Sequence, residues 1–227
     1  MKTIALIPAR LESQRFPNKL IKKLGGVPII ARTYIAALNT KLFDEVYVVS
    51  GNDEIIELIK SMNGLTFKSR KIHQSGTDRI AEAAKEIDHD IVVNLQGDEP
   101  FINIDSIDNL IASFQDSSVK MASLMTSFNS FDEIKNPNHV KVTVDKNNNA
   151  IFFSRLPIPL GESEINKFNR HIGVYAFRKN TLINFSSLNR SKNDVKLNDI
   201  DFYKIEYFYF DVTNRNIADL FNVQYQT

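Results

Sequence analysis

Three short runs of apolar, mostly β-branched residues, separated by helical stretches, constrain the fold of this chain more than any other feature. The runs lie at residues 4–7, 46–49 and 91–95. Amphipathic stretches typical of helices lie at residues 29–38, 54–62 and 77–87. Uninterrupted apolar runs of this kind are typical of strands buried on both faces. The alternation predicts an α/β fold with a doubly wound, mostly parallel sheet.

The sequence pattern changes near residue 138. Residues 140–144 and 150–154 flank an Asn-rich turn, which predicts an antiparallel hairpin, and a further strand is predicted at 171–177. We therefore expect a single domain over residues 1–227 that includes a small antiparallel lobe at 138–178. The stretch 184–198 is rich in Ser, Asn and Lys, a composition that predicts a loop.

The charge balance and the lack of Cys exclude several classes of function. The 28 Lys and Arg residues nearly match the 27 Asp and Glu residues, so the net charge of +1 gives no global field to attract nucleic acid or anionic membrane. No apolar stretch approaches membrane-spanning length, and the first run is too short for a signal-peptide core. The chain has no Cys, which excludes disulfides and thiolate metal sites and agrees with a reducing compartment. We expect a cytoplasmic protein that binds neither nucleic acid nor membrane.

The loop after the first predicted strand carries three cations, Arg10, Arg15 and Lys19. In open α/β sheets ligands bind beyond the carboxyl ends of the strands, so these cations stand where a ligand would lie. Arg gives forked contacts to phosphate and Lys a point charge, and the three together match a triphosphate. The alternative is a solvated, charged surface loop.

A carboxylate, Asp98, follows the third predicted strand directly. Mg²⁺ takes oxygen ligands and commonly shares them with phosphates, so Asp98 is a candidate metal ligand. A Gly-Asp pair is also typical of a plain turn. The neighbouring Glu99 could assist the metal, but the favoured interpretation is that it faces solvent or caps the helix expected to begin near Asp105.

A polar loop with a glycine, residues 73–77, leads into the third predicted helix, for which Thr77 is the expected N-cap. Backbone amides at such a helix start, with Gly76 permitting close approach, can bond a base or a phosphate oxygen. The alternative is an ordinary helix cap. His73 has no second His or carboxylate at ligand spacing, so we do not include it in the site.

Six segments between residue 4 and about residue 177 carry a recognisable pattern. They are, in order, Pro8-Ala9-Arg10 with Ser13, Arg15, Pro17 and Lys19; His73-Gln74-Ser75-Gly76-Thr77 with Arg79; Asn94-x-Gln96-Gly97-Asp98-Glu99-Pro100; Asn136-Pro137-Asn138-x-Val140-Lys141; Phe153-Ser154-Arg155 with Ile158-Pro159; and Arg170-His171-x-Gly173-x-Tyr175. In this order the segments resemble the CMP-KDO synthetases, or 3-deoxy-manno-octulosonate cytidylyltransferases. The CMP-sialic acid synthetases share the first segment but are less similar at the third and fifth.

The resemblance implies a nucleotide-diphospho-sugar transferase-like fold and an enzyme that joins CTP to the sugar acid KDO, releasing pyrophosphate, for lipopolysaccharide or capsule. It implies a Mg²⁺ cofactor and a homodimer formed through the 140–178 region. It also implies the site residues: Arg10, Lys19 and Asp98 for catalysis; Pro8, Ala9, Arg10, Ser13, Arg15, Lys19, Gln74, Ser75 and Gly76 for the nucleotide; Arg155, His171 and Tyr175 for the sugar acid; Asp98 for the metal.

The C-terminal third departs from the family pattern. The family carries a second metal ligand in a Val-Asp-Thr-Pro segment, whereas here Asp211 precedes the Val in Phe210-Asp211-Val212-Thr213. Asp211 is thus either a second metal ligand or the cap of a helix that starts near Thr213. Two alternatives to the implied function stay open: activation of amino-KDO or a sialic-type ulosonic acid, and an impaired paralogue that only binds nucleotide. A glycosyltransferase is disfavoured because the cation loop suits a free triphosphate.

Overall fold

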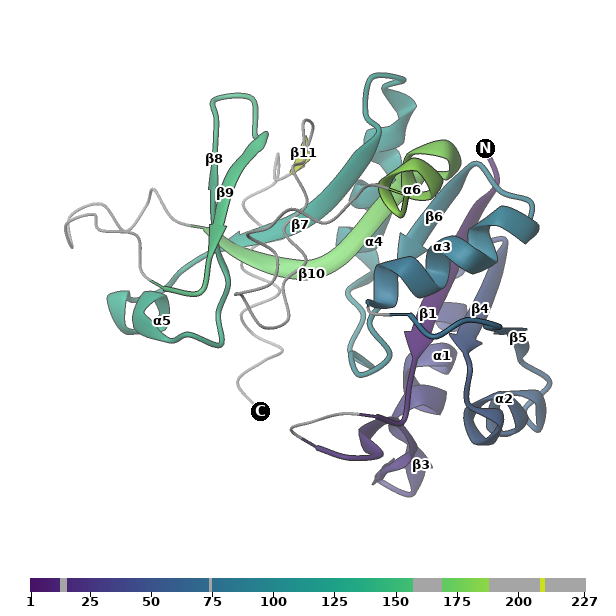
Figure 1. Cartoon of the computed structure of the whole chain (residues 1–227). Helices are drawn as coiled ribbons and strands as arrows, with labels where there is room; N and C mark the ends of the chain where they lie inside the picture. The colour runs from purple at the N-terminus through teal and green to yellow at the C-terminus, as the bar shows by residue number, and fades with distance from the viewer. Residues whose placement is uncertain (13–15, 74, 157–168, 188–208, 211–227) are drawn as a thin grey trace. The chain divides into compact units, whose positions relative to one another are not determined.

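The computed structural model describes residues 1–12, 16–73, 75–156, 169–187 and 209–210. The chain divides into two compact units (Figure 1). Unit 1 comprises residues 1–102 and 176–205, and unit 2 comprises residues 103–175 and 206–227.

Four parallel strands form the sheet of unit 1, in the order β6, β1, β4, β5. Ile4 on β1 lies opposite Glu45 on β4 and Val92 on β6. The apolar side chains of β1 and β6 are buried on both faces of the sheet, which confirms the interpretation of the apolar runs. The strands are β1 (Thr3–Ala9), β4 (Glu45–Ser50), β5 (Leu65–Lys68) and β6 (Ile91–Asn94).

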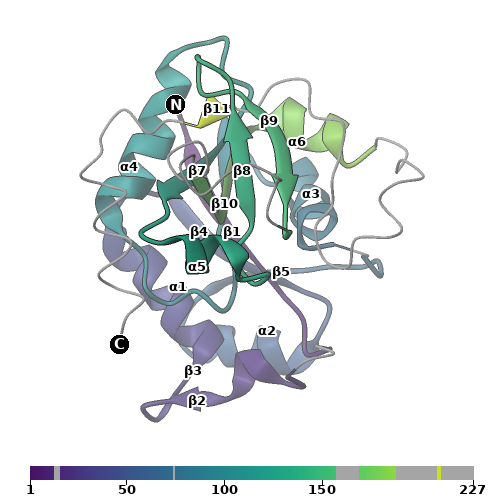
Figure 2. The same ribbon diagram turned by 90° about the vertical axis from the view of Figure 1, so that its left-hand side faces the viewer.

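Helices cover both faces of this sheet, as Figures 1 and 2 show for α1 and α3. The turn between β2 and β3 uses Gly25 and Gly26 at φ of 57° and 81°, values that favour glycine. None of the described helices is long and apolar enough to cross a membrane. The elements are α1 (Ile29–Thr40), α2 (Asp53–Lys60), α3 (Gly76–Glu86) and α6 (Lys179–Phe185), with a short 3-10 helix η1 (Lys19–Ile21) and the hairpin β2 (Lys23–Leu24) and β3 (Val27–Pro28).

Unit 2 is built around the predicted antiparallel hairpin, β8 and β9, with β10 paired to β8 and β11 parallel to β7. The hairpin turn is held by the Asp145 carboxylate, which accepts from the N–H groups of Asn147 and Asn149 at 2.8 Å each, while Asn148 takes the left-handed φ of 63°. The elements are α4 (Ile104–Ala112), η2 (Ser113–Gln115), β7 (Met121–Ser127), α5 (Phe131–Lys135), β8 (Lys141–Val144), β9 (Ala150–Ser154), β10 (Asn169–Arg178) and β11 (Tyr209–Phe210).

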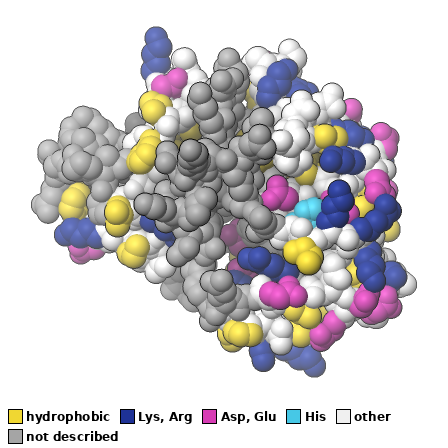
Figure 3. Space-filling view, in the orientation of Figure 1, with side chains coloured by type: hydrophobic (Ala, Val, Ile, Leu, Met, Phe, Trp, Pro, Cys, Tyr) yellow, Lys and Arg dark blue, Asp and Glu magenta, His cyan; other side chains and the backbone are white. Residues whose placement is uncertain are grey.

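Several elements were not predicted from the sequence, among them β5, β7, α5 and α6. Helix α6 includes residues 184 and 185, where a loop was expected, so that prediction is wrong at its start. Glu99 does not cap α4, because the N-cap is Asn103, whose side-chain oxygen accepts from the Ser106 N–H at 2.9 Å. Over the described surface in Figure 3, basic and acidic side chains are intermixed, in keeping with the balanced net charge.

Candidate functional site

One backbone hydrogen bond closes the base of the cation-rich loop after β1. The N–H of Asn18 donates to the carbonyl of Leu11 at 3.1 Å, and Asn18 takes the left-handed φ of 59°, which Asn tolerates better than most residues. Arg10 immediately precedes Leu11, and Lys19 immediately follows Asn18. The closure therefore holds the backbones of two predicted phosphate cations near one another.

Lys19 and Asp98 form an ion pair through Nζ and Oδ2, although they lie 79 positions apart in the sequence. Each side chain is about a third exposed, at 36% and 37%. An exposed pair of this kind stabilises a fold by less than about 1 kcal/mol, so its structural contribution is small. What matters about the pair is the position of its side chains: it places Lys19, a predicted phosphate ligand, beside Asp98, the candidate metal ligand.

Two glycines let neighbouring loops approach the end of β1 at Pro8. A Cβ atom on Gly97 would lie 3.2 Å from the Pro8 carbonyl oxygen and 3.2 Å from Ile30 Cδ1. A Cβ atom on Gly76 would lie 3.1 Å from Pro8 Cγ. All three distances are shorter than ordinary packing contacts, so a Cβ atom at either position would crowd its neighbours. The three segments singled out in the sequence therefore meet at the carboxyl edge of the parallel sheet, where ligands bind in such folds.

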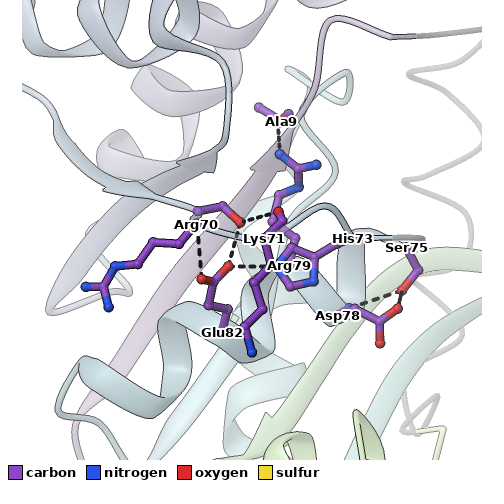
Figure 4. Close-up of polar contacts among 9 residues, drawn as sticks. Ala9, Arg70, Lys71, His73, Ser75, Asp78, Arg79 and Glu82 are labelled. Atoms are coloured by element: carbon purple, nitrogen blue, oxygen red, sulfur yellow. Dashed lines mark hydrogen bonds and ion pairs between the residues drawn. The ribbon is translucent and has the colours of Figure 1, made fainter. Parts of the chain in front are cut away.

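The N-cap of α3 is Ser75, two residues before the expected Thr77, so the predicted cap is wrong. Ser75 Oγ accepts from the Asp78 N–H at 3.1 Å and donates to Asp78 Oδ2 at 2.8 Å (Figure 4). Both hydroxyls suit a cap, but the helix begins at Gly76, where the close approach to Pro8 needs a residue without Cβ.

Arg79 is a site residue to which the sequence analysis gave no role. Its side chain runs from α3 to the end of β1, where Nη1 donates to the Ala9 carbonyl at 3.0 Å (Figure 4). Only 9% of the residue is exposed. Burial, followed by the charge of Arg10, lowers the pKa of the Arg79 guanidinium, and Glu12 and Glu82 oppose this. Its presence in a family segment was the only available sequence signal.

Glu82 links the segment before α3 to the helix itself (Figure 4). Its carboxylate accepts from Ser69 Oγ at 2.6 Å, from the Arg70 N–H at 3.0 Å and from His73 Nε2 at 2.6 Å. Burial alone would raise the pKa of the Glu82 carboxyl, but these hydrogen bonds lower it to about 2. His73, which the sequence analysis left out of the site, thus has a structural partner in Glu82.

We expect Glu82→Gln to lower the free energy of unfolding by roughly 2 kcal/mol at neutral pH. The folded carboxyl has a pKa of about 2, whereas an ordinary Glu carboxyl has a pKa of 4.5. The stabilisation by this carboxylate is therefore complete above pH 4.5 and is lost as the pH falls toward 2. Urea unfolding across this range measures the effect, and the difference between wild type and variant should shrink with falling pH. Glu86→Gln, which affects only the exposed pair with Arg70, is the control. A difference that does not change with pH would contradict the prediction.

The three predicted sugar-acid residues all lie in unit 2. The His171 and Tyr175 rings lie 5.3 Å apart on one face of β10, and Arg155 follows β9, with Nη1 donating to the Pro137 carbonyl at 3.2 Å. The Phe153 and His171 rings form a T-shaped pair with centroids 5.1 Å apart and an angle of 80° between the ring planes. Burial lowers the pKa of the His171 imidazole to about 3, so this side chain is neutral at neutral pH.

The hydrogen bonds of Ser123 indicate the tautomer of His171. Ser123 Oγ lies 2.8 Å from the Val174 carbonyl and 3.2 Å from the Ile172 carbonyl, so its single proton goes to a carbonyl. The same oxygen lies 3.1 Å from His171 Nε2 and must accept there. We assign the proton of the neutral ring to Nε2, which leaves Nδ1 as an acceptor.

Lys141, named in the fourth family segment but given no role, is fully buried in unit 2. Its Nζ donates to the carbonyls of Asn136 and His139 at 2.9 Å each and to that of Arg155 at 2.7 Å. Burial, and then the charge of Arg155, lowers the pKa of the Lys141 ammonium. The ammonium therefore ties the loop before β8 to the backbone of a predicted sugar-acid residue.

Four predicted site residues lie outside the described part of the chain: Ser13, Arg15, Gln74 and Asp211. Within the described ranges, no group of three or more His, Asp or Glu side chains is placed to hold a metal ion. Asp98 supplies a carboxylate beside Lys19. This arrangement suits Mg²⁺, which needs only one or two protein carboxylates when phosphates provide further oxygens.

Comparison with known proteins gives the class first. A family model described as cytidylyltransferase matches residues 4–217. A solved 4-diphosphocytidyl-2C-methyl-D-erythritol synthase from Anaerococcus prevotii is 15% identical, with a TM-score of 0.55 over 98% of this chain and 84% of that one, and shows the fold alone. The fold and the matched segments are those of a cytidylyltransferase.

More similar relatives narrow the class. The 3-deoxy-manno-octulosonate cytidylyltransferase of Flavobacterium johnsoniae is 49% identical over 83% of this chain and 79% of its own length. That of Francisella tularensis is 42% identical over 81% and 77%. A solved CMP:2-keto-3-deoxy-manno-octonic acid synthetase, in complex with CTP, is 34% identical with a TM-score of 0.80, covering 86% of this chain and 81% of its own. The chain belongs to the 3-deoxy-manno-octulosonate cytidylyltransferase family.

Proposed function

We propose that this chain transfers the cytidylyl group of CTP to KDO. The anomeric hydroxyl of the sugar acid attacks the α-phosphorus in line, a new phosphorus–oxygen bond forms, and the bond to the β-phosphate oxygen breaks. The products are CMP-KDO and pyrophosphate, and the hydroxyl proton passes to solvent. Positioning and charge neutralisation supply most of the catalysis in such transfers, and no covalent enzyme intermediate is needed.

The observation that carries this proposal is the ion pair between Lys19 and Asp98 at the carboxyl edge of the parallel sheet. It places a cation suited to phosphate and an oxygen ligand suited to Mg²⁺ beside each other, and Arg10 stands across the base of the same loop. This pairing of charges suits a triphosphate that carries a metal ion. Membership in the family supplies CTP and KDO as the substrates.

We assign the triphosphate to Arg10, Arg15 and Lys19, with Ser13 and the backbone of Pro8 and Ala9 beside it. Gln74, Ser75 and Gly76 would recognise the cytosine base. Because Ser75 already donates to Asp78, its hydroxyl can only accept a further bond. Asp98 and, as a second ligand, Asp211 would hold Mg²⁺. When bound, the ion would neutralise phosphate charge and help to activate the attacking hydroxyl.

We assign the sugar acid to Arg155, His171 and Tyr175 of unit 2. Arg155 carries the charge that a carboxylate needs, and its guanidinium suits a forked contact. His171 is neutral at neutral pH because of burial, so it can bond a sugar hydroxyl without contributing charge. We further propose a homodimer that works in the cytoplasm; the small lobe at 138–178 would form its interface.

The test is pyrophosphate release from CTP, Mg²⁺ and KDO. We expect ATP and GTP to be used at least about tenfold less efficiently, because a base that leaves buried polar groups unpaired is rejected. Equal turnover of all four nucleotides would reject the assignment of residues 74–76 to the base. A panel with amino-KDO and a sialic acid tests the choice of acid. CTP binding without turnover of any acid would favour the impaired paralogue.

A further inference from the structure

Asn52 stands at the N-cap position of α2 but does not cap the helix. Asn is among the residues that most favour this position, because its side-chain oxygen normally accepts an N–H of the first turn. Here the Asn52 side chain makes no such bond. By contrast, the N-cap residues of α3, α4 and α5, which are Ser75, Asn103 and Ser130, all accept a first-turn N–H.

The side chain of Asn52 reaches instead into the cation-rich loop after β1. Its Oδ1 accepts from the Leu11 N–H at 3.2 Å, and its Nδ2 lies 3.4 Å from Glu12 Oε1. The Asn52 backbone is itself fixed, because its N–H donates to Ser50 Oγ at 3.1 Å and its carbonyl accepts the Ile56 N–H at 3.2 Å. The side-chain amide of Asn52 is thus fixed in position relative to β4 and α2.

The backbone on both sides of Arg10 is consequently fixed by groups from other elements. The Ala9 carbonyl accepts from the buried Arg79, and the Leu11 N–H donates to Asn52. The Leu11 carbonyl accepts from Asn18, which closes the loop. Arg10 itself is exposed, so its direction depends on this backbone.

We propose that Asn52 is a positioning residue for the nucleotide: it holds the Leu11 peptide so that Arg10 faces the CTP phosphates. The assignment of Arg10 to the phosphates rests on the proposed function. The Asn52 side chain bonds the loop instead of capping the helix, and this bond favours a preorganised phosphate site. Preorganisation reduces the conformational entropy that is lost when the ligand binds.

Asn52→Ser separates the two roles of this position. Serine is a good N-cap, so α2 keeps or gains stability, but its hydroxyl is too short to reach the Leu11 N–H. Asn103→Ser is the matched control, because it is the same substitution at an N-cap whose side chain does cap its helix. We expect the melting temperature of both variants to stay at or above that of wild type.

Two measurements test the proposal. Amide hydrogen exchange at Leu11 should be at least about tenfold faster in Asn52→Ser than in wild type, and unchanged in Asn103→Ser. The Kd of CTP, measured by calorimetry without a sugar acid, should rise about tenfold in Asn52→Ser, which corresponds to about 1.4 kcal/mol, while KM for KDO stays the same. Unchanged Leu11 exchange or an unchanged Kd would overturn the role of Asn52.

The exchange measurement needs no substrate, so it separates this inference from the proposed function. If wild type releases no pyrophosphate with any acid, the proposed function fails, whereas faster Leu11 exchange with weaker CTP binding still supports the positioning role of Asn52.

Asn52→Asp provides a second variant, since it keeps an oxygen for the Leu11 N–H but sets a carboxylate against that of Glu12. We expect it to weaken CTP binding and Glu12→Gln in the same chain to restore it. A double variant as weak as Asn52→Asp would contradict the Glu12 contact.

Discussion

Asp98→Asn is expected to lower kcat at least about a hundredfold, comparable with the loss of a principal electrostatic stabiliser of the transition state. The substitution keeps the shape of the side chain and removes the charge that pairs with Lys19 and that would hold Mg²⁺. Because the side chain is 37% exposed and its ion pair adds little to stability, the melting temperature should change little. Pyrophosphate release with saturating substrates, measured over a range of Mg²⁺ concentrations, gives the result.

Asp132→Asn is the control for this experiment, since Asp132 also forms an exposed ion pair with a lysine, Lys135, at 3.6 Å. It should leave kcat and the Mg²⁺ requirement unchanged. Near-normal turnover in folded Asp98→Asn would move the metal to other ligands and reject Asp98 as a catalytic residue.

Lys141→Met is expected to lower the free energy of unfolding by about 3 kcal/mol. Replacing a buried charge with an apolar side chain of similar volume is often harmless. Here it is not, because three backbone carbonyls, those of Asn136, His139 and Arg155, lose the same donor. Each hydrogen bond to a charged group contributes roughly 1.5–3 kcal/mol, and partial access of water to the carbonyls reduces the sum.

Urea unfolding of the variant measures the loss, with Lys120→Met as the control. Lys120 lies in the same unit and, among the described residues, donates to one carbonyl, that of Ser117 at 2.8 Å, at an exposed site. The control should stay within about 0.5 kcal/mol of wild type. Equal stability of Lys141→Met and wild type would show that the three carbonyls find other donors.

The core strands of unit 1 could be predicted because their sequence is dominated by one requirement, burial on both faces. That requirement produces the apolar runs of β1, β4 and β6. Strand β7 escaped prediction because Ser123 and Thr126 interrupt its apolar pattern, although both are buried. Ser123 is satisfied by carbonyls about fifty positions away, on β10, and no local pattern reports such a partner.

The same limit explains which parts of the site could be predicted. Arg10 and Lys19 lie in the segment that follows β1, Asp98 lies in the segment that follows β6, and their charges are evident in the sequence. Asn52 and Arg79 contribute through bonds to a backbone N–H and a backbone carbonyl that lie 41 and 70 positions away. The residues next to Asn52 and Arg79 in the sequence do not indicate these long-range hydrogen bonds. The N-cap of α3 was placed two residues late because two hydroxyl residues flank Gly76, and only the packing against Pro8 distinguishes them.

The ion pair between Lys19 and Asp98 also bears on which anions the empty enzyme attracts. Asp98 already neutralises part of the charge of Lys19, so a single inorganic phosphate that contacts only this lysine would gain little. Under the proposed function, a triphosphate would contact Arg10 as well as Lys19, and the additional forked contacts of the arginine would strengthen its binding. The ion pair would therefore favour polyphosphate ligands over monophosphates at this site.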